Sequence, residues 1–118
     1  MEVEMGHTST VVFAKIKGSE EKAFLRYQIE NGSMILVETY TPPEYRGQGI
    51  ARRLVEYAVN LAKDRGLTII PVCSYAVYFF MKNKDFRGVL HPQYRNLTDD
   101  EWSKLMEKAL SREKSKPR

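Results

Sequence analysis

The chain has 118 residues, 42% of them hydrophobic and 29% charged, which suits one globular domain and is too short for two ordinary ones. No apolar run approaches the roughly 20 residues of a membrane helix, and no hydrophobic signal segment opens the sequence, so we expect a cytoplasmic protein outside the membrane. The net charge of +4 favours an anionic partner, but the basic stretch SREKSKPR at the end carries much of the excess and indicates a solvated tail rather than a nucleic-acid-binding arm.

The cysteine and histidine content of the chain argues against disulfides and structural metal sites. Cys73 is the single cysteine, so no internal disulfide can form. His7 and His91 are isolated in the sequence, and no structural metal site is expected from them. We therefore expect residues 10–111 to fold as one domain on an apolar core, between a flexible N-terminus at 1–9 and a flexible basic tail at 112–118.

The first half of the domain predicts an antiparallel meander. Residues 10–17 are β-branched and apolar, and residues 22–30 alternate strictly between apolar and polar side chains. Asn31-Gly32 then forms the pair best suited to a two-residue hairpin turn. Residues 33–40 are accordingly expected to run back beside the preceding strand.

The second half predicts a crossover back to the sheet. From Ile50 to Ala62 the apolar residues recur at spacings of three and four, which predicts an amphipathic helix, and Gly66 suits its C-terminal cap. Residues 67–72 form a short apolar run typical of a buried strand. A strand, a helix and a second strand in this order favour parallel pairing of the two strands.

Two further helices and one short strand complete the prediction. Ser74 is a candidate cap for a helix at 75–84, and residues 86–90 form a candidate strand. Thr98 and Glu101 have the spacing of a capping box, which predicts a helix over 99–110. The fold class is thus α/β (α+β), with a mixed, mainly antiparallel sheet flanked by helices.

The stretch PPEYRGQGIARRL, residues 42–54, begins its helix with residues that cost stability. Glycine weakens a helix, and arginines in the first turn face its positive end. Both choices become useful if an anion binds the exposed N–H groups there. A P-loop is excluded because no Gly-Lys-Ser/Thr follows at the required spacing, and a dinucleotide fingerprint is excluded because Arg52 stands where the third glycine belongs.

The same stretch resembles a known cofactor motif. Arg46-x-x-Gly49-x-Ala51 follows an apolar strand and opens an amphipathic helix, as does the coenzyme A-binding motif of the GNAT superfamily of N-acetyltransferases. The segment IIPVCSYAVYFF is similar to the Pro-x-Cys-x-Tyr segment of the small, single-domain members. The resemblance covers residues 23–90 and implies a compact GNAT-like acyl-CoA N-acyltransferase fold.

The resemblance also implies where acetyl-CoA would bind. Backbone N–H groups of residues 48–51 would hold the pyrophosphate, and the pantetheine arm would run along residues 36–39, where the crossover strand diverges. The thioester would lie near Glu38, Thr39 and Cys73. The full set of residues implied to contact the cofactor is Thr39, Tyr40, Arg46, Gly47, Gln48, Gly49, Ile50, Ala51, Arg52, Cys73 and Ser74.

The candidates for the chemistry of acetyl transfer are Glu38, Cys73 and Tyr75. Glu38 ends the cofactor strand and is the general-base candidate, the alternative being a solvent-facing strand carboxylate. Cys73 precedes a helix N-terminus, a position that lowers the pKa of a thiol. It is a candidate for covalent acetylation or for protonating the leaving thiolate. The alternative is a small buried residue at a tight turn.

The usual acid of larger relatives is missing from this sequence. They place a tyrosine four residues after an alanine, and that position, counted from Ala76, is Phe80. Tyr75, beside Cys73, is the nearer possibility. We therefore predict an acetyl-CoA-dependent N-acetyltransferase acting on a primary amine of a small molecule, a lysine or an N-terminus. The alternatives are a non-catalytic CoA-binding module that acts as a sensor or partner protein and, last, a basic nucleic-acid-binding domain.

Overall fold

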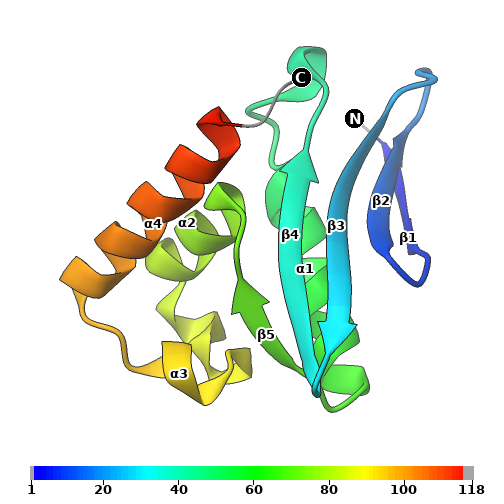
Figure 1. Cartoon of the computed structure of the whole chain (residues 1–118). Helices are drawn as coiled ribbons and strands as arrows, with labels where there is room; N and C mark the ends of the chain where they lie inside the picture. Colours follow the sequence, from blue (N-terminus) through cyan, green and yellow to red (C-terminus); the bar gives the residue numbers. More distant parts are fainter. Residues whose placement is uncertain (1, 116–118) are drawn as a thin grey trace.

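The five strands form one sheet in chain order. The computed structural model describes residues 2–115 and shows strands β1 to β5 as neighbours in sequence order (Figure 1). All neighbours pair antiparallel except β4 and β5, which are parallel. The mixed, mainly antiparallel sheet predicted from the sequence is confirmed. The strands are β1 (Val3–His7), β2 (Val11–Ile16), β3 (Lys22–Glu30), β4 (Ser33–Tyr40) and β5 (Thr68–Pro71).

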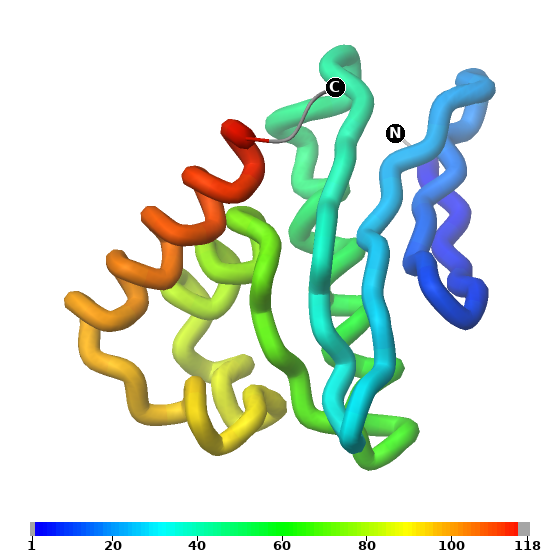
Figure 2. Tube along the Cα trace, viewed as in Figure 1, coloured from blue at the N-terminus to red at the C-terminus, as the bar shows by residue number. Residues whose placement is uncertain are grey.

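The helices all follow β4 in the chain and pack against the sheet or against each other. Helix α1 packs along strands β2 to β5, and α4 packs on α2, which contacts β4. The trace in Figure 2 shows α1 behind the strands and α2 between α4 and the sheet. The helical segments are η1 (Pro43–Tyr45), α1 (Ile50–Asp64), α2 (Ser74–Lys82), η2 (Lys84–Val89), α3 (Pro92–Arg95) and α4 (Asp99–Lys114).

The core forms where the apolar face of the meander meets α1. Ala23, Leu25 and Tyr27 of β3 are fully buried, as the alternation of β3 predicts. Ile29 continues the same alternation but is 46% exposed, because the pairing of β2 with β3 begins at Val11 and Arg26 and leaves the end of β3 without a neighbour on that side. Burial in a sheet thus depends on neighbouring strands as well as on alternation.

Strands β4 and β5 separate before β4 ends, and this separation positions the site. Their pairing stops at Leu36 and Pro71. The backbone N–H groups of Val72 and Cys73 both donate to the carbonyl of Leu36, which turns the chain away from β4 and into α2. The last residues of β4 therefore have β3 on one side and no β5 partner on the other.

Two elements differ from the sequence-based expectation because of tertiary pairing. Residues 1–9 show no periodicity, yet β1 lies within them and pairs with β2 from Val3↔Ile16 to His7↔Val12. Residues 86–90, predicted as a strand, instead belong mainly to the 3-10 helix η2, and only Leu90 makes an isolated bridge to Ile69. Short apolar runs do not distinguish a strand from a helical turn by pattern alone.

The two later helices begin and end differently from the prediction. Helix α2 starts at Ser74, and its N-cap residue is Cys73 rather than Ser74. The capping box of Thr98 and Glu101 is confirmed, but α4 continues to Lys114, into the segment predicted as a flexible tail. Residues 116–118 of that predicted tail lie outside the described residues.

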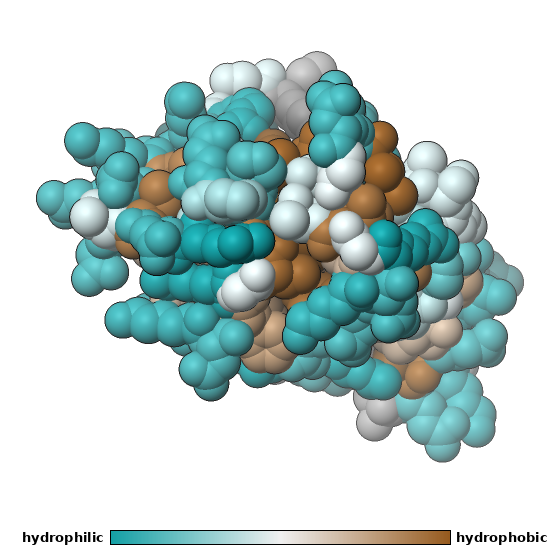
Figure 3. All heavy atoms as spheres, turned by 90° about the horizontal axis from the view of Figure 1, so that it is seen from below, coloured by the Kyte–Doolittle hydropathy of each residue, from teal (hydrophilic) through white to brown (hydrophobic). Residues whose placement is uncertain are grey.

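Polar side chains cover most of the end of the molecule that lies at the bottom of Figure 1. Figure 3 shows hydrophilic side chains over most of this face, with apolar side chains between them in small groups. Among residues 2–115, no helix is long and apolar enough to cross a membrane.

Candidate active site

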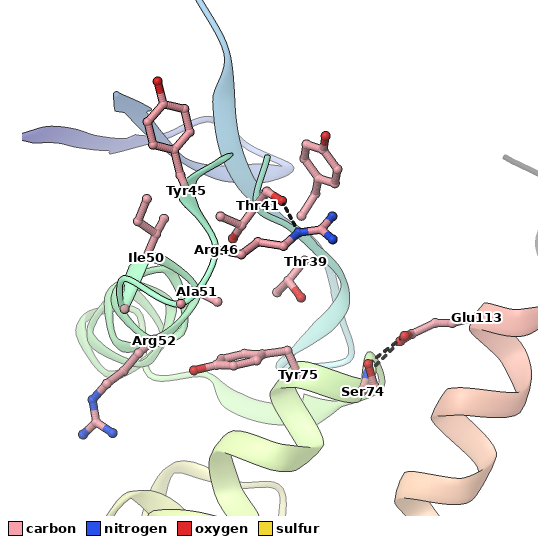
Figure 4. Close-up of a pocket in the computed structure, with 13 residues that line it drawn as sticks. Thr39, Thr41, Tyr45, Arg46, Ile50, Ala51, Arg52, Ser74, Tyr75 and Glu113 are labelled. Carbon is pink, nitrogen blue, oxygen red and sulfur yellow. Dashed lines mark hydrogen bonds between the residues drawn. The ribbon is translucent and has the colours of Figure 1, made fainter. Parts of the chain in front are cut away.

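A pocket of about 530 Å³ opens where β4 ends and where α1 and α2 begin. Figure 4 shows its walls: β4 and the following turn on one side, the start of α1 on another, and the start of α2 with a side chain of α4 on the third. The lining residues are Thr39, Tyr40, Thr41, Tyr45, Arg46, Gly47, Gly49, Ile50, Ala51, Arg52, Ser74, Tyr75 and Glu113.

The start of α1 presents uncapped backbone N–H groups to this pocket. Gly49 is the N-cap residue, so no side chain caps the helix, and its first turn contains no acidic residue. Gly47 and Gly49 have φ angles of +79° and +83°, a region that side chains of L-residues rarely adopt. A Cβ atom added at either glycine would meet no atom within 4 Å, so the space beside the backbone is open. This is the geometry of an anion site.

Three arginines lie near this helix start, in different environments. Arg46 donates from Nε to the carbonyl of Thr41 at 2.8 Å and lies 6.0 Å from the ring centre of Tyr40. Arg52 bonds Glu56 at 3.1 Å and Asn83 at 3.0 Å, and Figure 4 shows its guanidinium directed away from the other labelled side chains. Arg53 is exposed and lies outside the pocket lining. Arg46 is therefore the arginine best placed to meet an anion.

The separated end of β4 offers free backbone groups along the pocket. The N–H of Tyr27 donates toward β2, to Thr10, and strand alternation gives Leu25 the same direction. Leu25 pairs with Thr39, so the backbone N–H and carbonyl of Thr39 point away from β3, toward the side that β5 has left. An extended ligand could pair with this edge as a further strand.

Glu113 closes the pocket from α4, and sequence reasoning missed it. One carboxylate oxygen accepts from the backbone N–H of Ser74 at 2.7 Å, and the other accepts from the Ser74 hydroxyl at 2.6 Å. The carboxylate of Glu113 thus caps the N-terminus of α2, where the N-cap residue makes no side-chain hydrogen bond. Thr41 and Tyr45 were missed as well. The helix predicted from the sequence ended near residue 110, so Glu113 fell in the segment predicted as a flexible tail.

Cys73 lies next to the pocket but is not part of its lining. Its side chain is 4% exposed, and burial raises the pKa of the thiol to about 11; the backbone of Ala76 and the side chain of Thr39 oppose this shift only in part. The lowered pKa expected from the helix start is wrong, because desolvation outweighs the helix N-terminus. At neutral pH the sulfur is a thiol, which disfavours covalent acetylation.

We therefore predict that Cys73 in the folded protein reacts with iodoacetamide at least about tenfold more slowly than a free cysteine, because only the thiolate reacts. The reaction in denaturant is the control. A folded-state rate equal to that in denaturant would contradict the burial and raised pKa of Cys73.

The same raised pKa predicts a pH dependence of stability. Because the folded pKa lies above the ordinary value of 9.0, the thiol contributes stability below pH 9 that is lost as the pH rises toward 11, and Cys73→Ala should lack this contribution.

The other two catalytic candidates occupy different environments. Tyr75 lines the pocket, and Figure 4 shows its ring extending from α2 toward α1. Burial raises the pKa of Tyr75, with nearby Arg52 acting in the opposite direction, so the hydroxyl keeps its proton at neutral pH. Glu38 is not among the lining residues, and its carboxylate forms an ion pair with Arg26 at 3.0 Å.

Most residues predicted to contact the cofactor come together in this pocket. Those that line it are Thr39, Tyr40, Arg46, Gly47, Gly49, Ile50, Ala51, Arg52 and Ser74. Gln48 and Cys73 do not: Gln48 is exposed beside the two glycines, and Cys73 is buried behind Ser74. Whether the lining residues bind the cofactor stays a prediction.

Comparisons with known proteins identify one family, a relative in sequence and a similar fold. Residues 12–89 match the family described as GCN5-related N-acetyl-transferase. Protein NATD1 of Danio rerio is 31% identical over 81 residues, which cover 68% of this chain and 68% of that protein. The solution structure of a GCN5-like protein from Staphylococcus aureus has a similar fold, with a TM-score of 0.61 and 21% identity over 79% of this chain and 96% of that one.

Proposed function

The chain belongs to the GCN5-related N-acetyltransferase family, and from this membership and the pocket we propose that it transfers an acetyl group from acetyl-CoA to a primary amine. The observation that carries the proposal is the uncapped start of α1, held open to the pocket by Gly47 and Gly49. A pyrophosphate group matches its unpaired N–H groups and positive end.

The residues present fit the other parts of acetyl-CoA as well. Arg46 lines the same pocket, with its guanidinium beside Thr41 and Tyr40, and would supply a positive charge to a phosphate there. The outward-facing backbone of Thr39 offers a donor and an acceptor to the amide groups of a pantetheine arm. The start of α1, the edge of β4 and the start of α2 all line this one pocket, so a single extended cofactor could contact all three.

Tyr75 is the proposed hydrogen-bond donor at the departing sulfur. When bound, acetyl-CoA supplies an activated thioester, so transfer forms an N–C bond, breaks the C–S bond and requires a proton at that sulfur. Tyr75 lines the pocket with a protonated hydroxyl, whereas Phe80 has no proton to give and is fully buried. The attacking amine would lose one proton to solvent, and Tyr75 would give one to the sulfur and regain it from solvent, so that the products are an amide and a thiol.

Tyr75→Phe is expected to lower kcat about tenfold, since it removes one donor to developing charge, and to leave the KM for acetyl-CoA nearly unchanged. The matched control is Tyr78→Phe, because Tyr78 lies on the same helix, is 46% exposed and does not line the pocket. Equal kcat values for Tyr75→Phe and the unmodified protein would remove this role.

The experiment that tests the function is incubation with acetyl-CoA and a panel of primary amines, read by mass spectrometry of the products. Acetylated amine and free CoA in equal amounts are the expected result. A second candidate, a CoA-binding module without turnover, is favoured by Phe80 at the position of the usual acid and by the protonated Cys73. Cofactor binding with no acetylated product from any amine would select that candidate.

A further inference from the structure

The carboxylate of Glu113 is fixed in the pocket by an element that lies outside the family match. The match ends at residue 89, and α4 begins at Asp99. The helix is held to the rest of the protein by Trp102, which is 1% exposed, and not only by Glu113. The position of the carboxylate is therefore set by the C-terminal helix, outside the residues that match the family.

The pocket has a positive end and a negative end. The positive end is the uncapped start of α1, and Glu113 is the one carboxylate among the described lining residues; the guanidinium of Arg52 pairs with Glu56 and is directed away from the pocket. Figure 4 shows Glu113 and Ser74 on the side opposite the start of α1. If the α1 end accepts the phosphates, the anionic end is the place for a cationic group.

The hydrogen bonds to Ser74 orient the carboxylate without using all of its capacity. A carboxylate has about four acceptor positions on its two oxygens, and Ser74 occupies one on each. The remaining positions suit an ammonium group, which is a compact cation with several donors.

We propose that Glu113 binds the ammonium form of the acceptor amine and thereby selects acceptors without a carboxylate next to the amine. The proposal rests on the proposed function, since it names the acceptor class of the same pocket. A free α-amino acid would bring its carboxylate beside Glu113, and like charges repel at that distance. Lysine side chains, peptide N-termini and simple alkylamines carry the charge alone. Glu113 acts here in binding, before the amine gives up its proton.

The test is a titration of phenethylamine into the protein, free and saturated with CoA, followed by the backbone amide signals of Ser74 and Glu113. Phenylalanine adds the carboxylate to the same amine, and phenethyl alcohol replaces its charge with a hydroxyl. We expect phenethylamine to shift both signals, and the other two probes to bind at least about tenfold more weakly. Glu113→Gln should reduce phenethylamine affinity at least about tenfold.

Two variants separate this role from a structural one. Glu107→Gln removes an exposed carboxylate from the same helix outside the pocket lining, and should leave phenethylamine binding unchanged. The second variant is Glu113→Gln itself, which removes the charge but keeps a side-chain oxygen that can accept from Ser74. If Glu113 only holds α4 in place, Glu113→Gln will lower the melting temperature while the preference for phenethylamine over phenethyl alcohol stays the same, and the proposal is overturned.

The outcomes also separate this proposal from the proposed function. If CoA shifts the signals of residues 47–51 but no probe distinguishes charge at Ser74 and Glu113, the acceptor site is wrong and the cofactor site stands. If CoA shifts nothing and phenethylamine still binds in a Glu113-dependent manner, the ammonium site stands and the proposed function fails. Absence of phenethylamine binding in both forms of the protein overturns the proposal.

Discussion

Replacing Gly49 with alanine is expected to weaken acetyl-CoA binding about 100-fold. The φ angle of +83° places a side chain in a strained conformation that costs roughly 1–2 kcal/mol, so the helix start will shift or lose population. In the present conformation the added methyl group would stand in the open space beside the N–H groups. Charge-assisted hydrogen bonds of about 1.5–3 kcal/mol each are lost when the phosphate is displaced from those groups. Isothermal titration calorimetry measures the effect directly.

Gly18→Ala is the matched control for this experiment. Gly18 has a φ angle of +85°, and a Cβ atom there also meets no atom within 4 Å, but it lies in the turn between β2 and β3, away from the pocket. Both variants should lose a similar amount of stability in urea denaturation, while only Gly49→Ala should lose affinity. Equal affinities for acetyl-CoA in the two variants would show that the N-terminus of α1 does not hold the cofactor.

Replacing Trp102 with alanine should destabilise the protein by about 3–5 kcal/mol, the usual cost of removing a large aromatic side chain from a core. Trp102 is 1% exposed, and the guanidinium of Arg87 lies 4.9 Å from its ring centre. Its indole N–H has no hydrogen-bond partner among the described residues, which places the expected loss toward the lower end. Urea denaturation followed by circular dichroism gives the free energy of unfolding.

The control for Trp102 lies on the same helix. Leu110 is 52% exposed, and Leu110→Ala should change stability by less than about 0.5 kcal/mol. A loss below about 1 kcal/mol for Trp102→Ala would mean that α4 is not part of the cooperative unit. In that case the position of Glu113 in the pocket would not be fixed by the fold.

The sequence predicts those parts of the fold whose signals are local. The hairpin at Asn31-Gly32, the capping box of Thr98 and Glu101, and the glycine-led start of α1 each need only a few neighbouring residues, and the structure has all three. The splayed end of β4 was expected from the family resemblance, and β5 does leave β4 at Leu36. Local turn and cap signals, together with the family resemblance, therefore predicted most of the residues that line the pocket.

The features that the sequence did not reveal depend on contacts distant along the chain. Strand β1 exists through its pairing with β2, and η2 replaces a predicted strand although Leu90 still reaches Ile69. The thiol of Cys73 responds to burial, which its position before a helix does not disclose. Glu113 lies 39 residues from Ser74, in a segment whose composition resembles a solvated tail. Each of these is decided by tertiary packing.

A titration of acetyl-CoA into the isotopically labelled protein, followed by the backbone amide signals, tests the cofactor site directly. We expect large, saturable shifts for residues 47–51 at the start of α1 and for Thr39 on the open edge of β4. The signals of Gly18 and Gly66, in turns away from this pocket, should stay in place. Saturating acetyl-CoA that leaves residues 47–51 unshifted would contradict the central claim that this helix start is the cofactor site.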